Sequence, residues 1–351
     1  MNEKHALHAI FRCDAGREDG LGHIKRCLNL AQVLTQRGCR VEFVTTEGPG
    51  QIGASVLRQP ALYANRTSKS RPGSLEDATL LADMRDEETT RELLIIDSKR
   101  IQAEYLTALR ETFITCVIDD DANVGIHADI LINGRLDARR EMYADSASNI
   151  GSYLCGARYN MVAPEYFDLT DRPSEDCVLV TLGGEDPGNM TRWILNCLAP
   201  KYPEKEFYAV VGPAHPDPAS IAEVAVSNAN IVIVESPESL APYIAKCSTA
   251  ISAGGTTCYE LSAARRPFGI VLLEAHQTAF ARSIVDCGAG ILALDVGETD
   301  ARKMTEAFQA ICNSNQAETI RKIQTRTFPQ SGLTAVADAL LELSTCGNLS
   351  Q

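Results

Sequence analysis

A histidine stands where a short apolar segment gives way to a helical pattern near the start of the chain. The segment reads R-C-D-A-G-R-E-D-G-L-G-H-I-K-R, from Arg12 to Arg26, and it contains Asp14 and His23. The dipole of a helix disfavours an imidazolium at its N-terminus, so the neutral ring can accept a proton near pH 7. We therefore predict His23 as a general base. The alternative is a histidine that caps its own helix.

The same segment is rich in glycine. Gly16, Gly20 and Gly22 follow the apolar run 8–13, and glycines at the carboxyl end of a strand let a ligand approach the backbone closely. The third glycine of the dinucleotide fingerprint is missing, and His23 stands at the helix start instead. This loop therefore predicts a ligand site but argues against NAD.

A second glycine loop opens the other half of the chain. It reads V-T-L-G-G-E-D-P-G-N, with Gly183, Gly184 and Asn189 after a strand pattern. Paired glycines after a strand can form a nest of amides for phosphate. The alternatives are a tight turn, or a helix start at Asp186-Pro187.

The strongest phosphate signal is the segment I-S-A-G-G-T-T-C-Y-E-L at 251–261. Free amides and hydroxyls converge there as a strand ends and a helix starts, which is typical of a diphosphate cradle. The candidate residues are Ser252, Gly254, Gly255, Thr256 and Thr257. Glu260 follows one turn later and is a candidate for ribose hydroxyls, the alternative being an exposed helix glutamate.

The elements that must position these loops are short apolar strands alternating with helical stretches, which predicts an α/β fold with parallel sheets. Expected strands are 8–13, 40–45, 93–97, 115–119 and 129–133, then 177–182, 206–211, 231–234, 249–252, 268–273 and 290–294. Expected helices include 23–36, 76–92, 103–112, 316–327 and 333–343. A further strand end, L-E-A-H-Q, directs His276 and Gln277 toward the same ligand region.

The length of 351 residues favours two domains. We place them at 1–163 and 164–351, with 157–175 as the linker and the last helix packing back on the first domain. Each domain is expected to be a Rossmann-like doubly wound sheet, with a cleft between the two. Chemistry is expected on the first domain and nucleotide on the second.

The charge and the cysteine pattern exclude several classes of function. A net charge of −13 argues against nucleic acid. Apolar runs are too short to span a membrane, and the N-terminal residues do not form a signal peptide, so a cytoplasmic location is expected. The 12 cysteines contain no C-x-x-C pair. We expect neither metal nor cofactor, and the oligomeric state stays open.

Four separated motifs carry a family resemblance. They are R-x-D…G-x-G-H-x-x-R from Arg12 to Arg26, G-x-x-Y at Gly156 and Tyr159, L-G-G-x-D-P-x-N at 182–189, and I-S-A-G-G-T-T-x-x-E-L at 251–261. In this order the chain resembles the UDP-2,4-diacetamido-2,4,6-trideoxy-altropyranose hydrolases of pseudaminic acid synthesis (PseG) and the related spore-coat polysaccharide proteins of SpsG type.

The resemblance implies the two-domain GT-B fold of MurG-like glycosyltransferases, with UDP on the second domain. By resemblance, His23 activates a water that displaces UDP from the anomeric carbon with inversion, and Asp14 lies in the same site. Gly22, Arg26, Asp97, Tyr159, His276 and Gln277 are then candidates for the sugar side. The leaving diphosphate is already a stable anion, so the reaction requires no metal.

This chain departs from the family at three places. Asp97-Ser98-Lys99 replaces D-H-Y, Ala163 replaces an arginine, and His276 replaces an asparagine. Each lies where a sugar or phosphate contact is expected, so the sequence leaves the sugar open, and it leaves UDP open against another nucleotide such as CDP. A GT-B glycosyltransferase and a non-catalytic nucleotide-sugar-binding protein remain alternatives. The presence of both Asp14 and His23 argues against the second.

Overall fold

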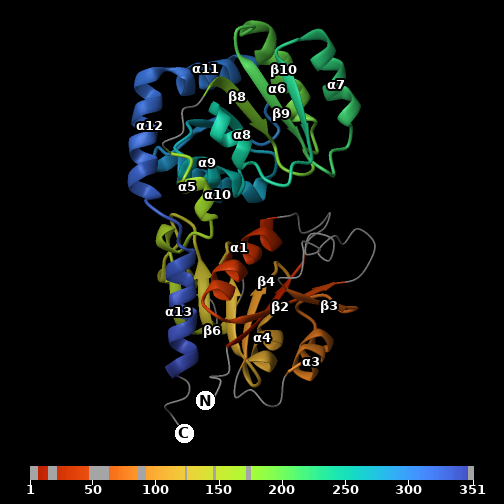
Figure 1. The fold of residues 1–351 in the computed structure, drawn as a ribbon, viewed down its shortest axis with the longest axis vertical. Helices are drawn as coiled ribbons and strands as arrows, with labels where there is room; N and C mark the ends of the chain where they lie inside the picture. The colour runs from red at the N-terminus through yellow and green to blue at the C-terminus, as the bar shows by residue number, and fades with distance from the viewer. Residues whose placement is uncertain are drawn as a thin grey trace. The chain divides into compact units, whose positions relative to one another are not determined.

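The computed structural model divides the chain into two compact units (Figure 1). Unit 1 comprises Met1–Met161 and Gly332–Gln351, and unit 2 comprises Val162–Ser331. The structure describes residues 7–14, 22–46, 63–85, 92–122, 125–144, 148–170 and 175–346. The sequence placed the boundary after residue 163, two residues beyond the division in the structure.

Unit 1 is built on a seven-stranded, all-parallel sheet with the strand order β3-β2-β1-β4-β5-β6-β7. Its strands are β1 (His8–Cys13), β2 (Arg40–Thr46), β3 (Ala64–Ser68), β4 (Leu93–Asp97), β5 (Ile114–Ile118), β6 (His127–Asn133) and β7 (Asn149–Cys155). β1 lies between β2 and β4, with Ala9 beside both Val41 and Leu93. The sheet reverses its winding there.

Helices cover both faces of this sheet because alternate strand residues point to opposite sides. On one face α1 (Gly22–Gln36) and α13 (Leu333–Cys346) pack against a core that contains Phe11 and Phe43. On the other face α3 (Leu75–Asp83) and α4 (Ala103–Arg110) cover a core that contains Ile10. The final helix therefore completes the first unit.

Unit 2 repeats the plan with six parallel strands in the order β10-β9-β8-β11-β12-β13. They are β8 (Glu175–Thr181), β9 (Glu206–Val211), β10 (Ile231–Glu235), β11 (Cys247–Ala253), β12 (Phe268–Val271) and β13 (Ile291–Leu294). The winding reverses between β8 and β11, the two strands that precede the predicted phosphate loops. In open α/β sheets, ligands bind outside the carboxyl ends of the strands at such a point.

The helices of unit 2 bury both faces of its sheet. α6 (Met190–Leu198), α7 (Pro218–Ser227), α11 (Ala301–Cys312) and α12 (Ser314–Thr327) contribute to one core. α8 (Ala241–Lys246), α9 (Thr257–Ala263) and α10 (Thr278–Asp286) also contact the strands, and α5 (Pro164–Phe167) contacts α9. The alternate strand residues Leu179, Ala250 and Ile270 are buried as well.

The sequence located most of these elements but missed two strands and misjudged one helix. β3 and β7 lie at the two edges of the first sheet, and four of the five β3 residues are exposed, so hydrophobic alternation is absent there. α3 ends at Asp83 rather than at residue 92. In the part of the chain that the structure describes, no helix is long and apolar enough to cross a membrane.

Candidate functional site

His23 lies on the first turn of α1, beside the carboxyl end of β4. Its Nδ1 is 2.5 Å from Oδ1 of Asp97, the last residue of β4. Arg26, one turn later, grips the same carboxylate with Nε at 2.6 Å and Nη2 at 2.7 Å. Its Nη1 donates to Asp120 Oδ2 at 2.6 Å. The winding of the sheet thus brings together side chains that are 74 residues apart in sequence.

The ionised state of Asp97 decides which nitrogen of the His23 ring carries the hydrogen. Its side chain is 0% exposed. Burial opposes its ionisation, but Arg26 and His23 outweigh burial and hold the pKa of Asp97 far below the usual range. A carboxylate only accepts hydrogen bonds, so Nδ1 of His23 is the donor. The lone pair of the neutral ring is then on Nε2, and the side chain is 15% exposed. This pair has the arrangement of a general base with its orienting carboxylate.

Asp14 belongs to a different group of contacts. It accepts hydrogen bonds from the Thr46 backbone N–H at 2.7 Å and from the Thr46 hydroxyl at 2.8 Å, and it pairs with Arg12 at 3.1 Å. Asp14 is buried, and its contacts lie toward β2. The contacts of the described residues do not join it to His23. A direct catalytic role for Asp14 therefore stays a prediction.

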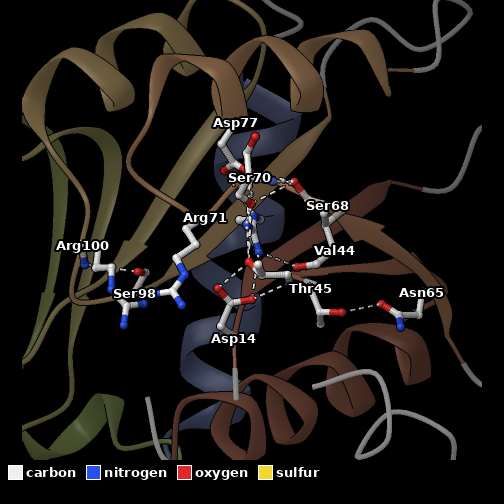
Figure 2. A network of polar contacts seen from close by, with 12 residues as sticks. Asp14, Val44, Thr45, Asn65, Ser68, Ser70, Arg71, Asp77, Ser98 and Arg100 are labelled. Carbon is white, nitrogen blue, oxygen red and sulfur yellow. Dashed lines mark hydrogen bonds and ion pairs between the residues drawn. The ribbon is translucent and has the colours of Figure 1, made fainter. Parts of the chain in front are cut away.

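Arg12 is the centre of that second group, and its partners Asp14, Val44, Ser70 and Asp77 are labelled in Figure 2. Its guanidinium is fully buried and binds Asp77 through Nε at 3.1 Å and through Nη2 at 3.0 Å. It also donates to the carbonyls of Val44 and Ser70. Tyr105 donates to Asp77 at 2.8 Å. The arginine therefore ties together the carboxyl ends of β1, β2 and β3 with helices α3 and α4.

The loop that contains Gly73 and the loop that follows β4 are in close contact beside this network. Gly73 has φ +101, and a Cβ there would meet the Arg100 carbonyl oxygen at 2.0 Å. The Arg100 backbone N–H in turn donates to the Ser98 hydroxyl at 3.2 Å (Figure 2). Ser98 is half-buried and Lys99 is exposed. The departure from D-H-Y therefore places a serine and a lysine directly after the carboxylate that orients His23.

In unit 2, the first phosphate loop has an open part and a structural part. A Cβ at Gly183 or at Gly184 would meet nothing within 4 Å, whereas one at Gly212 would meet the Gly184 carbonyl oxygen at 2.5 Å. The paired glycines therefore have open space where side chains would stand, while Gly212, directly after β9, lies close against their backbone. Gly183 has φ +85, a conformation that favours glycine.

The side chains at the end of that loop form hydrogen bonds within the protein. The Asp186 carboxylate accepts the Met190 and Thr191 backbone N–H groups, each at 2.8 Å, and so satisfies the first free amides of α6. The helix itself begins at Met190 and not at Asp186-Pro187, where the alternative prediction placed its start. Asn189 donates through Nδ2 to Ser220 at 2.8 Å. That side-chain amide supports α7, and its contact with nucleotide stays a prediction.

The second phosphate loop shows the same division. A Cβ at Gly254 would meet Leu272 Cδ2 at 2.7 Å and Ala281 Cβ at 3.2 Å, whereas Gly255 has open space around it. Ser252 is buried and its hydroxyl donates to the Ala253 carbonyl. Thr256 is exposed and makes no capping bond, and Thr257 begins α9. Gly255 and the threonines thus form the accessible part of this loop.

Glu260 is half-buried, and its carboxylate accepts a hydrogen bond from Tyr166, a buried tyrosine of α5. Burial and the charge of Glu260 raise the pKa of Tyr166, so its hydroxyl stays protonated. The linker segment therefore orients the carboxylate that the sequence assigned to ribose. It is not the free surface glutamate of the alternative prediction.

The remaining sugar-side candidates have varied surroundings. Gln277 accepts the Leu273 backbone N–H at 3.0 Å through Oε1, and His276 is exposed beside Glu274. Tyr159 packs on the core of unit 1, and Gly22 begins α1. Gly16 and Gly20 lie outside the described residues.

Several residues of these networks were not singled out from the sequence. Asp120 and its neighbour Asp119 follow β5, and a run of acids after an apolar strand was a signal for them. Burial raises the pKa of Asp119, which accepts a hydrogen bond from Tyr143 at 2.8 Å. Asp77 lies inside a helix, where no local pattern distinguishes it.

No family model matches the chain. It is similar to the spore coat polysaccharide biosynthesis protein SpsG of Bacillus subtilis (strain 168), with 26% identity over 301 residues, covering 83% of this chain and 84% of the relative. The expected likeness to SpsG-type proteins is therefore confirmed at the level of sequence similarity.

Solved structures share the fold. Acinetobacter baumannii MurG matches with a TM-score of 0.64 and 14% identity, covering 96% of this chain and 99% of its own. A UDP-GlcNAc 2-epimerase from Neisseria meningitidis, solved with UDP-GlcNAc, matches at 0.63 and 13%, covering 96% and 100%. The calicheamicin glycosyltransferase CalG4 matches at 0.60 and 14%, covering 99% and 100%. The chain thus has the predicted fold class, two parallel-sheet α/β units like those of MurG.

Proposed function

We propose that this chain is an enzyme that acts on nucleotide sugars, and that it hydrolyses a UDP sugar with inversion at the anomeric carbon. The observation that carries this proposal is the His23–Asp97 pair beside the carboxyl end of β4. The titles of its structural relatives, one of them bound to UDP-GlcNAc, support a nucleotide-sugar substrate. The name of its sequence relative supports a role in polysaccharide synthesis.

The step requires one proton acceptor. A water oxygen forms a bond to the anomeric carbon while the bond from that carbon to the diphosphate oxygen breaks, and Nε2 of His23 takes the proton of the water. The electron pair of the broken bond leaves on UDP. We propose Asp97, rather than Asp14, as the partner of the base, since Asp97 contacts the ring and Asp14 contacts Arg12.

We assign nucleotide binding to unit 2. The open surfaces of Gly183, Gly184 and Gly255 allow backbone amides to approach a diphosphate, since no side chain intervenes. Both loops follow β8 and β11, where the sheet reverses its winding. The Glu260 carboxylate, oriented by Tyr166, accepts hydrogen bonds from the ribose hydroxyls.

The test begins with thermal stabilisation by UDP, CDP, GDP and dTDP. Sugar conjugates of the best nucleotide are then incubated with the protein and followed by NMR. We expect stabilisation by UDP and release of the free sugar as the inverted anomer. His23→Ala should lower turnover by at least about a hundredfold while UDP binding is retained. His127→Ala, at the amino end of β6, is the matched control. Loss of UDP binding in His23→Ala would make the histidine structural.

The second candidate is a glycosyltransferase, in which an acceptor hydroxyl replaces the water. The likeness to CalG4, a glycosyltransferase by title, favours it. Slow UDP release that accelerates strongly on addition of an acceptor extract would establish transfer. UDP release that is unchanged by broad extracts, with free sugar formed in equal amount, would establish hydrolysis.

A further inference from the structure

Arg26 was expected to contact the sugar, but its guanidinium is committed elsewhere. Nε and Nη2 form a fork on Asp97, and Nη1 donates to Asp120. Three of its hydrogen-bonding directions therefore end on carboxylates within the protein. Its side chain is 12% exposed, so little of it is available to a ligand. The geometry is that of an arginine that serves its neighbours.

The position of Arg26 relative to the imidazole matters most. Nη2 lies 3.3 Å from Nδ1 of His23. Because Nδ1 already donates its hydrogen to Asp97, this approach is no hydrogen bond. It places a permanent positive charge against the ring. A nearby like charge disfavours protonation, whereas the Asp97 carboxylate favours it. The two charges act on the same ring in opposite directions.

We infer that Arg26 is a positioning residue that offsets the charge of Asp97, so that Asp97 fixes the His23 ring without forcing it into the imidazolium form. Asp120 in turn holds Arg26 in place and carries part of its charge. This inference rests on the proposed role of His23 as a base. A base oriented by a carboxylate alone would be protonated more readily, and the protonated fraction could not accept a proton from water.

The other ionisable groups around the pair are accounted for among the described residues. Cys27 contacts Asp97 through its thiol, and the Cys116 thiol of β5 also interacts with that carboxylate. Burial raises the pKa of both thiols, so both are neutral. Asp14, directly after β1, is paired with Arg12. Asp119, after β5, is bound to Tyr143. The charged groups in contact with the ring or with its partners are thus Asp97, Arg26 and Asp120.

The test measures the titration of His23 directly and needs no substrate. NMR of protein labelled with ¹³C histidine gives the titration midpoint of each of the 6 histidines, and His23→Gln identifies the signal of His23. We expect Arg26→Met to raise the midpoint of His23 by about one pH unit or more. Arg26→Lys should restore most of the difference because it retains the charge.

Asp120→Asn should shift the titration midpoint of His23 in the opposite direction. Removing this carboxylate leaves the Arg26 charge uncompensated, so the His23 midpoint should fall. If Arg26 and Asp120 only supported the fold, both variants would disturb the pair in one direction. A midpoint that is unchanged or lower in Arg26→Met, or one that does not fall in Asp120→Asn, would overturn the inference. If Arg26→Met fails to fold, Asp120→Asn still decides.

The proposed function is judged separately. If UDP-sugar turnover is found, the acid limb of its kcat/KM profile should follow the NMR midpoint of the free protein in each variant, with KM at neutral pH changing little. If the midpoints shift as expected but no nucleotide sugar is cleaved, the proposed function fails and the role of Arg26 in the protonation of His23 stands.

Discussion

The two units share one topology but differ in what they place around it. Unit 1 buries His8, Arg12, Asp14, Glu42, Asp77, Glu92, Asp97 and Arg135, and unit 2 buries only Asp186, His215 and Arg266 among the described ionisable Asp, Glu, His, Lys and Arg side chains. Where the winding reverses, unit 1 has a histidine and carboxylates, whereas unit 2 has glycines that face open space. The carboxyl edge of the same kind of sheet can thus carry charged side chains suited to proton transfer, or glycines whose backbone is accessible to a ligand.

The largest effect that tests this comparison comes from the buried arginines. Arg12→Met would leave Asp14 and Asp77 buried without their counterion, at a cost of about 3–5 kcal/mol in the free energy of unfolding. The matched change is Arg266→Met in unit 2, because Arg266 donates to the carbonyls of Ile244 and Ala264. It should cost about 1–3 kcal/mol. Urea unfolding measures the loss of stability in both variants. Equal losses would contradict the distinction between the charged interior of unit 1 and that of unit 2.

The glycines of unit 2 offer a second contrast. Gly254→Ala places a methyl group against Leu272 and Ala281, and we expect a loss of about 1–3 kcal/mol in folding stability. Gly255→Ala meets nothing and should change stability by less than about 0.5 kcal/mol. It should instead weaken UDP binding, measured by calorimetry. Unchanged UDP affinity in Gly255→Ala would remove this loop from the nucleotide site.

A third test concerns His8, on the first strand of unit 1. Burial favours its neutral form, but hydrogen bonds to Glu42 and Glu92 outweigh burial and raise the pKa of His8 above the ordinary value of 6.5. A raised folded-state pKa gives stability that is complete below pH 6.5 and is lost as pH rises through the folded value.

We therefore expect the stability difference between the natural protein and His8→Gln to shrink between pH 6 and pH 9, by about 1.4 kcal/mol for each unit of pKa elevation. Thermal unfolding across that range measures it. A constant difference would show that folding does not raise the pKa of His8.

The smallest effect is expected at the linker. Tyr166→Phe removes the hydroxyl that donates to Glu260, and we expect UDP affinity to fall by a factor of about 3 to 10, since one hydrogen bond contributes about 0.5–1.5 kcal/mol. Tyr243→Phe, on α8, is the matched control. Equal affinities for the two variants would leave Glu260 without its proposed role in ribose binding.

The fold could be predicted from the sequence because buried parallel strands are continuous apolar runs, as in β4, L-L-I-I-D. The strand β3, A-N-R-T-S, lies at an edge with its side chains in water, so it leaves no such pattern. For the site, the sequence identified His23 as a candidate base, and the family resemblance gave Asp97 separately as a candidate for the sugar side. Their contact depends on β1 lying beside β4, which no local pattern contains. The family resemblance placed Asp14 in the same site as His23, and in the structure its carboxylate is held by Arg12 and Thr46.

The return of the chain to unit 1 has a consequence for its synthesis. Leu333, Val336, Ala337 and Leu340 of α13 fill the core that Phe11 and Phe43 begin. Gly332 fits against the backbone of Arg158 and Asn160, where a Cβ would meet carbonyl oxygens at 2.5 Å. On the ribosome, the strands of unit 1 emerge first and yet cannot close their core until residues 333–340 are made. Unit 2 is synthesised between the two parts of unit 1, so all of its strands exist before α13 is made. Unit 1 therefore begins synthesis first but completes its core last.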